Sequence, residues 1–192
     1  MGIYTTKPLD SQGYKDLIDL IRKGYIDNDG HKHRPNNQLA TILVLQGNLG
    51  CRIGDIVNLE MENIEWDGEA WRLNLSEQKT GKKRYFIIPT PVKEFIDRWT
   101  NANNITHGRL FDITKQDVWF HLRPATAYLG LDKTSCHSLR KAAAIRVYED
   151  SGKDISVASS FLNHSNPSTT LIYLKRTSKQ MDDVLSQSVA LA

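Results

Sequence analysis

The last third of the chain contains polar residues whose types and spacing suit chemistry on a phosphate. His137 and Arg140 lie three residues apart, and His164 precedes Tyr173 by nine. Cleavage of a phosphodiester needs cations on the non-bridging oxygens, a nucleophile and a proton donor for the leaving oxygen. Arginine grips two oxygens with a planar fork, tyrosine forms a covalent ester, and histidine exchanges protons near neutral pH. We therefore expect cleavage of a DNA phosphodiester by a tyrosine hydroxyl.

A second arginine in the first half of the chain completes a possible clamp. Arg52 follows Gly50, a natural helix end, and opens a short apolar helix, so its side chain can point into a cleft beside Arg140. His137 and Arg140 share one face in the first turn of a helix expected over 135–150. The amino end of that helix adds partial positive charge for a phosphate.

A basic turn is the third candidate feature. Lys79, Lys82, Lys83 and Arg84 surround a turn between two expected strands. One interpretation is a hairpin that enters a DNA groove, with a lysine that protonates the leaving 5′ oxygen. The alternative is a turn that merely aids solubility.

The elements that must position these residues follow from hydrophobic periodicity. Helical spacing predicts helices over 9–23, 36–49, 52–59, 91–101, 115–129, 135–150, 154–163, 168–174 and 178–189, with Pro124 kinking or splitting the fifth. Alternation predicts strands over 63–66, 70–75 and 84–88, joined as an antiparallel meander. The polar stretch 24–35 reads as a loop, and its His31 and His33 lack an obvious third metal ligand. The expected fold is α+β, mainly α-helical, with a small three-stranded antiparallel sheet.

The composition is that of an ordinary globular domain. Of 192 residues, 40% are hydrophobic and 24% charged, and the net charge of +3 permits a nucleic-acid partner without requiring one. Cys51 and Cys136 form no metal-type spacing, which favours a reducing cytoplasm. Each cysteine directly precedes a candidate site residue. We expect both to be there because small side chains pack well, and the alternative is that their thiols make the site sensitive to oxidants. No signal peptide or membrane-spanning run is expected.

Five segments together carry a family resemblance: 49–59 with Arg52 and Asp55, 78–82 with Lys79, 137–140, 162–164 and 169–173. In these segments the chain resembles the catalytic domain of the tyrosine recombinase, or phage integrase, family. The likeness runs from about residue 9 onward. One departure is Asn163, where the family usually has glycine, but asparagine tolerates a left-handed backbone.

The resemblance implies a fold, a mechanism and a set of roles. The fold would be that of DNA breaking-rejoining enzymes, with all 192 residues in a single catalytic domain and no amino-terminal core-binding domain. Tyr173 would attack the scissile phosphate to give a 3′-phosphotyrosine and a free 5′ hydroxyl, without metal, nucleotide or other cofactor. Lys79 would be the general acid and Asp55 a supporting residue. The phosphate would be held by Arg52, Arg140, His137 and His164.

The resemblance also implies partners. These are double-stranded DNA and, on it, a homotetramer, while a monomer in free solution is compatible with the sequence. The tail after Tyr173, about 175–192, would dock on a neighbouring subunit or pack back on its own chain. We expect a cytoplasmic protein of bacterial or phage origin. The competing hypotheses are a catalytically silent DNA-binding regulator of the same fold and a type IB topoisomerase-like activity.

Overall fold

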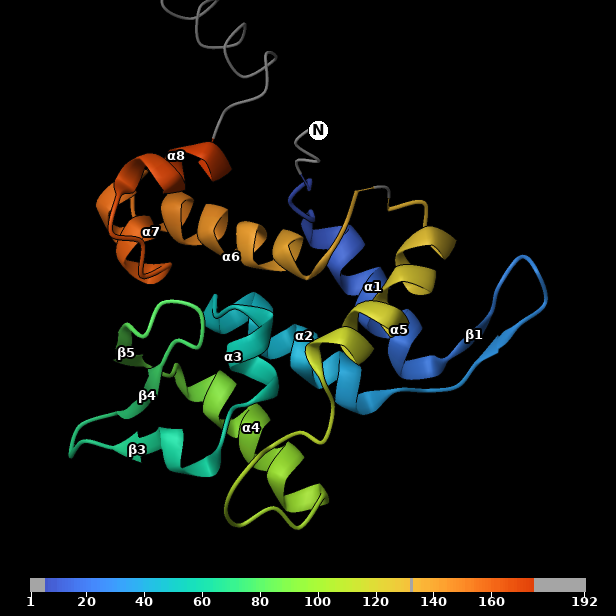
Figure 1. The fold of residues 1–192 in the computed structure, drawn as a ribbon, viewed down its shortest axis with the longest axis horizontal. Helices are drawn as coiled ribbons and strands as arrows, with labels where there is room; N and C mark the ends of the chain where they lie inside the picture. The colour runs from blue at the N-terminus through green and yellow to red at the C-terminus, as the bar shows by residue number, and fades with distance from the viewer. Residues whose placement is uncertain (1–5, 132, 175–192) are drawn as a thin grey trace, which may run out of the picture. The chain divides into compact units, whose positions relative to one another are not determined.

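A computed structural model describes residues 6–131 and 133–174, except for the side chains of 172–174. The chain divides into two compact units, Met1–Ala143 and Ala144–Ala192 (Figure 1). Each unit is described by itself.

The first unit is built around one buried helix. It contains α1 (Ser11–Lys23), α2 (Asn37–Leu49), α3 (Ile53–Val57), α4 (Thr90–Ala102), α5 (Lys115–Tyr128), the short 3-10 helix η1 (Met61–Asn63) and the start of α6 (Cys136–Asp150). Helix α2 is apolar on nearly all sides, and its Leu39, Ile42 and Leu45 are fully buried. A helix that is apolar all round belongs in a core, and α1, α3 and α4 pack against it.

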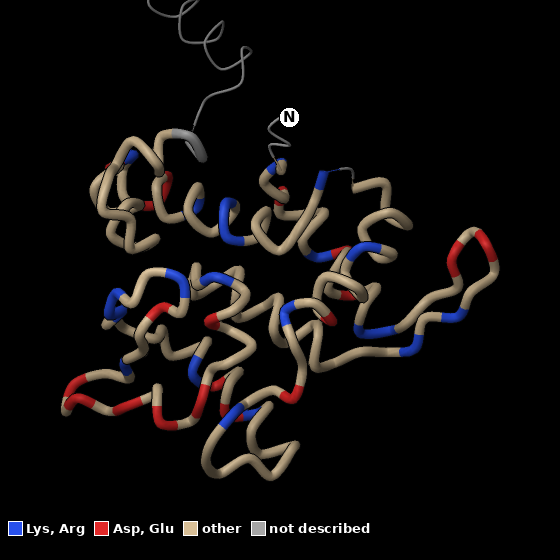
Figure 2. The backbone as a smooth tube through the Cα atoms, in the orientation of Figure 1, with Lys and Arg blue, Asp and Glu red and all other residues tan. Residues whose placement is uncertain are grey.

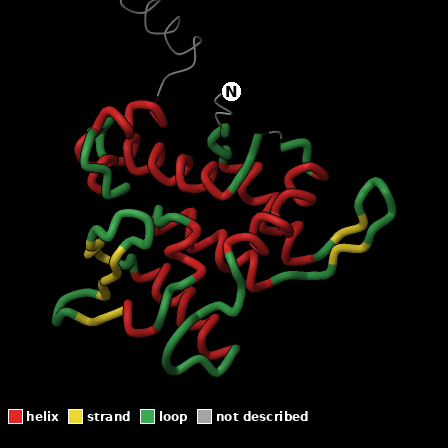
Figure 3. The backbone as a smooth tube through the Cα atoms, in the orientation of Figure 1, coloured by secondary structure: helices red, strands yellow, loops and turns green. Residues whose placement is uncertain are grey.

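The predicted meander is present in the first unit (Figure 3). Strands β3 (Ile64–Trp66), β4 (Trp71–Ser76) and β5 (Lys83–Ile87) pair antiparallel in the order β3-β4-β5. Leu73 on the central strand lies opposite both Ile64 and Phe86. Leu73 and Leu75 are buried while the residues between and beside them are partly or fully exposed, which is the period-2 pattern that identified the strands.

Two details differ from the expectation. The stretch predicted as a plain loop contains a short hairpin of β1 (Tyr25–Ile26) and β2 (Lys32–His33), in which the Tyr25 and His33 rings stack 4.4 Å apart. Helix α5 continues through Pro124 instead of splitting. The proline removes one backbone hydrogen bond, but buried Leu122 and Ala125 on either side keep the helix packed.

The second unit contains the end of α6 and the helices α7 (Ile155–Phe161) and α8 (Pro167–Leu174). The Asp154 carboxylate caps α7 by accepting from the backbone N–H of Ser156 at 2.7 Å. The helix predicted over 178–189, and the tail about 175–192, lie outside the described residues. Among the described residues, no helix is both long and apolar enough to cross a membrane.

Candidate active site

A sharp turn after α2 presents Arg52. Gly50 ends α2 with a φ of 60°, a left-handed conformation that glycine adopts without strain. Arg52 then precedes the first turn of α3 with an extended backbone. Its side chain is 25% exposed and forms an ion pair with Glu77, with 2.5 Å between Nη1 and Oε2. One arginine of the predicted clamp is therefore fixed but open to solvent.

The second arginine lies against the same turn. Ser135 starts α6 by accepting a hydrogen bond from the backbone N–H of His137 at 3.2 Å. One turn on, Arg140 is almost completely buried, and its Nη1 donates to the carbonyl of Gly50 at 2.5 Å. Arg140 thus contacts the backbone two residues before Arg52, so the structure brings the two predicted clamp residues together.

His137 lies in the field of these cations. Partial burial of its ring lowers its pKa to about 4, and so do the positive charges of four side chains: Lys141, Arg140, Arg52 and Lys79. The residue as a whole is still exposed. The imidazole is therefore neutral at physiological pH in the DNA-free protein, and it can accept a proton or a hydrogen bond. Four predicted residues from three separate segments meet here.

Lys79 is exposed on the turn between β4 and β5, which carries basic residues, whereas the β3–β4 turn is acidic (Figure 2). Asp55 fixes this turn from α3, because its Oδ1 accepts from the backbone N–H of Gln78 at 2.9 Å. Asp55 is buried, and its contact supports the turn that carries Lys79. The carboxylate that pairs with Arg52 belongs to Glu77.

The basic residues after Lys79 divide into two kinds. Lys83 is exposed and Lys82 half-buried, as a surface that contacts DNA requires. Arg84, expected on that surface, is instead 3% exposed. Its Nη2 donates to the carbonyl of Leu49 at 3.1 Å and its Nη1 lies 3.4 Å from Glu77. The structure therefore places Arg84 in the interior, where it supports the Arg52 turn, and its role as a DNA contact stays untested.

The other two predicted residues belong to the second unit. Asn163 has a φ of 55°, the left-handed backbone expected where the family has glycine. His164 follows it, and its Nδ1 lies 3.0 Å from the Oγ1 of buried Thr170 on α8, which orients the ring. Tyr173 lies on the same helix, but its side chain is outside the described part of the structure.

Sequence reasoning did not single out two buried charges in the first unit. Glu77 is 1% exposed between Arg52 and Arg84. Lys141 is 7% exposed, burial lowers its pKa, and its Nζ donates to the carbonyl of Thr6 at 2.6 Å. Strand alternation could have revealed Glu77, since it continues the inward positions Leu73 and Leu75.

Both cysteines are buried beside the site. Burial raises the pKa of the Cys51 and Cys136 thiols to about 11. A buried thiol that stays protonated is a poor nucleophile, so the packing interpretation is favoured over oxidant sensitivity.

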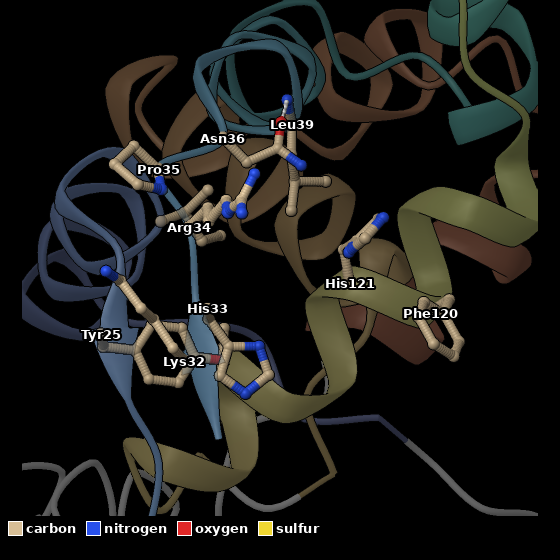
Figure 4. Close-up of a pocket in the computed structure, with 11 residues that line it drawn as sticks. Tyr25, Lys32, His33, Arg34, Pro35, Asn36, Leu39, Phe120 and His121 are labelled. Atoms are coloured by element: carbon tan, nitrogen blue, oxygen red, sulfur yellow. Dashed lines mark hydrogen bonds between the residues drawn. The ribbon is translucent and has the colours of Figure 1, made fainter. Parts of the chain in front are cut away.

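Other polar groupings lie apart from this cluster. A hollow of about 290 Å³ lies between the β1–β2 hairpin and α5, with His33, Phe120 and His121 on its wall (Figure 4). At the hairpin tip, Asp27, Asp29 and His31 each place one possible metal-ligand atom within 4.8 Å of the others. The Asp27 carboxylate, however, accepts hydrogen bonds from the backbone of Asp29 and His31, so it is explained by the turn that it stabilises.

Comparisons with known proteins converge on one family. The sequence model of the phage integrase family matches residues 7–180. A probable integrase/recombinase of Bacillus subtilis, YoeC, is 31% identical over 134 residues, which cover 66% of this chain and 71% of YoeC. Tyrosine recombinase XerA of Pyrococcus furiosus is 27% identical over 191 residues, covering 95% of this chain and 62% of XerA.

A solved structure shares the fold. The XerH site-specific recombinase, bound to its palindromic difH substrate after cleavage, superposes with a TM-score of 0.71 at 14% identity. The match covers 94% of this chain but 53% of XerH, so the chain spans about half of that protein and about three fifths of XerA.

Proposed function

Since this chain belongs to the phage integrase family of tyrosine recombinases, we propose that it cleaves and rejoins double-stranded DNA at specific sites through a 3′-phosphotyrosine. The family and the mainly helical fold with a three-stranded sheet are those expected from the sequence. The observation that carries the proposal is the gathering of Arg52, Lys79 and Arg140 around a neutral His137. Positive charges gathered this closely favour the binding of an anion such as a phosphate.

In the proposed reaction each group has one task. The Tyr173 hydroxyl oxygen attacks phosphorus, the bond to the 5′ oxygen breaks, and Lys79 protonates that oxygen as it leaves. Arg52 and Arg140 stabilise the extra negative charge of the transition state. Neutral His137 accepts the phenolic proton, and His164 hydrogen-bonds the phosphate.

The reverse reaction explains why no external energy source enters the proposal. The phosphotyrosine retains the energy of the broken bond, so a 5′ hydroxyl from a partner duplex can attack it and release Tyr173. Two such exchanges through a Holliday junction recombine two duplexes. We propose that the protein acts in the cytoplasm as a homotetramer on DNA, with Lys82 and Lys83 contacting the phosphate backbone.

A suicide substrate tests the activity. The substrates are duplexes nicked next to the scissile position, with random sequence around the nick. After cleavage, the short piece that carries the free 5′ hydroxyl dissociates, so it cannot reseal the strand and the covalent complex is trapped. We expect the wild-type chain to select cleavable sites and form an adduct that Tyr173→Phe does not form. Binding without an adduct on any site would instead indicate the silent regulator. Relaxation of supercoiled plasmid without recombination would indicate the topoisomerase-like activity.

A further inference from the structure

Besides Asp55, a second buried carboxylate links the Arg52 turn to the Lys79 turn in the first unit. The Glu77 side chain is fully buried, and its Oε2 lies 2.5 Å from Arg52 Nη1, while its Oε1 lies 3.4 Å from Arg84 Nη1. Arg84 in turn donates to the carbonyl of Leu49 at the end of α2. Glu77 therefore determines where the guanidinium of Arg52 lies relative to the turn that presents it.

The same residue also closes the turn that carries Lys79. Thr80 Oγ1 donates to Glu77 Oε2 at 2.6 Å, and the backbone N–H of Gly81 donates to the Glu77 carbonyl at 2.8 Å. The backbone N–H of Glu77 donates to the Lys82 carbonyl at 2.9 Å. Lys79 lies inside this closed turn, two residues from the carboxylate that binds Arg52.

The carboxylate is charged despite its burial. Burial alone would raise the pKa of Glu77, but the Thr80 hydrogen bond and the charges of Arg52 and Arg84 outweigh it and lower the pKa. A buried ion with this many partners has little freedom to move, since each lost contact leaves a charge unpaired. The link between Arg52 and the lysine turn is therefore stiff.

We propose that Glu77 is a positioning residue that sets Arg52 and the Lys79 turn so that both reach the same phosphate. The inference rests on the proposed function, since it assumes that Arg52 stabilises the transition state and that Lys79 protonates the leaving oxygen. Because its side chain is fully buried, Glu77 would act without touching DNA or the reacting atoms. Its contribution is geometric, and displacements of about 1 Å in such sites can slow reactions roughly 100-fold.

The first variant removes the charge but keeps the shape. Glu77→Gln is expected to slow adduct formation on the nicked duplex roughly 100-fold. The matched control is Asp67→Asn. Asp67 also pairs with an arginine at 2.5 Å, but its partner is Arg72 on β4 and not Arg52. The control should cleave at the wild-type rate, and all three proteins should bind the duplex alike.

The second variant loosens the lysine turn alone. Thr80→Val removes the hydroxyl that bonds Glu77 and leaves the Arg52 pair in place. We expect adduct formation to slow roughly tenfold, because the free energy of one lost hydrogen bond to a charged group corresponds to a rate change of at least about that size. Because Thr80 is exposed, this variant should fold, and it therefore still tests the inference if Glu77→Gln does not fold.

A substrate with sulfur in place of the bridging 5′ oxygen separates positioning from general damage. A thiolate leaves without protonation because a thiol has a pKa of about 8.5, far below that of an alcohol. On this substrate Thr80→Val should match wild type, because only the Lys79 step is impaired. Glu77→Gln should recover only in part, because Arg52 is displaced as well.

The outcomes separate this inference from the proposed function. Absence of an adduct with the wild-type chain would refute the proposed function itself. With an active wild type, equal rates for Glu77→Gln and Asp67→Asn would overturn the inference. So would a Thr80→Val defect of the same size on the oxygen and sulfur substrates.

Discussion

Arg52 and Arg140 share a turn but differ in what each contributes. Arg52 is partly exposed and anchored by Glu77, whereas Arg140 is buried and bonded to the Gly50 carbonyl. Loss of Arg140 would therefore also leave a buried carbonyl without its donor, at a cost of about 1–3 kcal/mol in the free energy of unfolding. Arg52 is the cleaner residue for testing chemistry alone.

Replacing Arg52 with alanine should remove one arm of the phosphate clamp. We expect Arg52→Ala to slow covalent adduct formation roughly 100- to 1000-fold, as for loss of one transition-state donor. DNA binding in a gel-shift assay should change little, since many phosphate contacts share the affinity. Arg72→Ala, which removes an arginine paired with Asp67 on the sheet, is the control and should retain activity. A parallel loss of binding and cleavage in Arg52→Ala would argue against a transition-state role.

The family resemblance singled out Arg52, Lys79, His137 and Arg140, because these residues belong to segments whose order and intervals match those of the family. The same reasoning missed Glu77, since a lone glutamate in a basic turn resembles an ordinary surface residue. Alternation along β4 indicates that Glu77 points inward, but its partner Arg52 lies 25 positions earlier and reaches across to the sheet. Long-range pairing of this kind is not visible in local sequence.

At the scale of elements, the helices and strands with clear periodicity were predicted closely, and the exceptions have tertiary causes. The β1–β2 hairpin is too short for a pattern, and Tyr25 packs against both His33 and Tyr128 of α5, 4.9 Å away. Helix α5 passes Pro124 because its neighbours are buried. In both places packing from elsewhere in the chain outweighs local propensity.

The junction between α7 and α8 depends on one left-handed residue. Asn163 has a φ of 55°, its N–H donates to the Ser160 carbonyl, and the N–H of His164 donates to Ser159. Alanine and glycine both remove the asparagine side chain, but only alanine is strained there. We expect Asn163→Ala to be about 1 kcal/mol less stable than Asn163→Gly in urea unfolding. Equal stabilities would mean that this backbone conformation is not maintained in solution.

At the scale of the whole molecule, a net charge of +3 understates how the positive charge is distributed. Arg52, Lys79, Arg140 and Lys141 all act on His137 and lower its pKa. In the absence of DNA these cations repel one another and disfavour protonation of the imidazole. A bound phosphate would offset that repulsion, so DNA binding is expected to raise the pKa of His137.

The lowered pKa of His137, caused by partial burial of its ring and by the nearby cations, predicts how stability changes with pH. The ordinary pKa of 6.5 applies to His137 in the unfolded chain, whereas the folded value is about 4. Between these values the unfolded state binds a proton that the folded state does not, so stability falls as the pH is lowered from 6.5 to 4. Because the residue is exposed, solvent screening makes this loss modest.

His137→Gln isolates the effect, because glutamine keeps hydrogen-bonding capacity but does not titrate. Thermal unfolding at several pH values between 7 and 4 should show a smaller loss of stability for His137→Gln than for wild type. An NMR titration of the wild-type imidazole should have its midpoint near 4 in the free protein. A midpoint near 6.5, or parallel stability curves, would show that neither burial of the ring nor the charges of Arg52, Lys79, Arg140 and Lys141 act on His137 in solution. The proposed phosphate site would then have to be assembled by DNA itself.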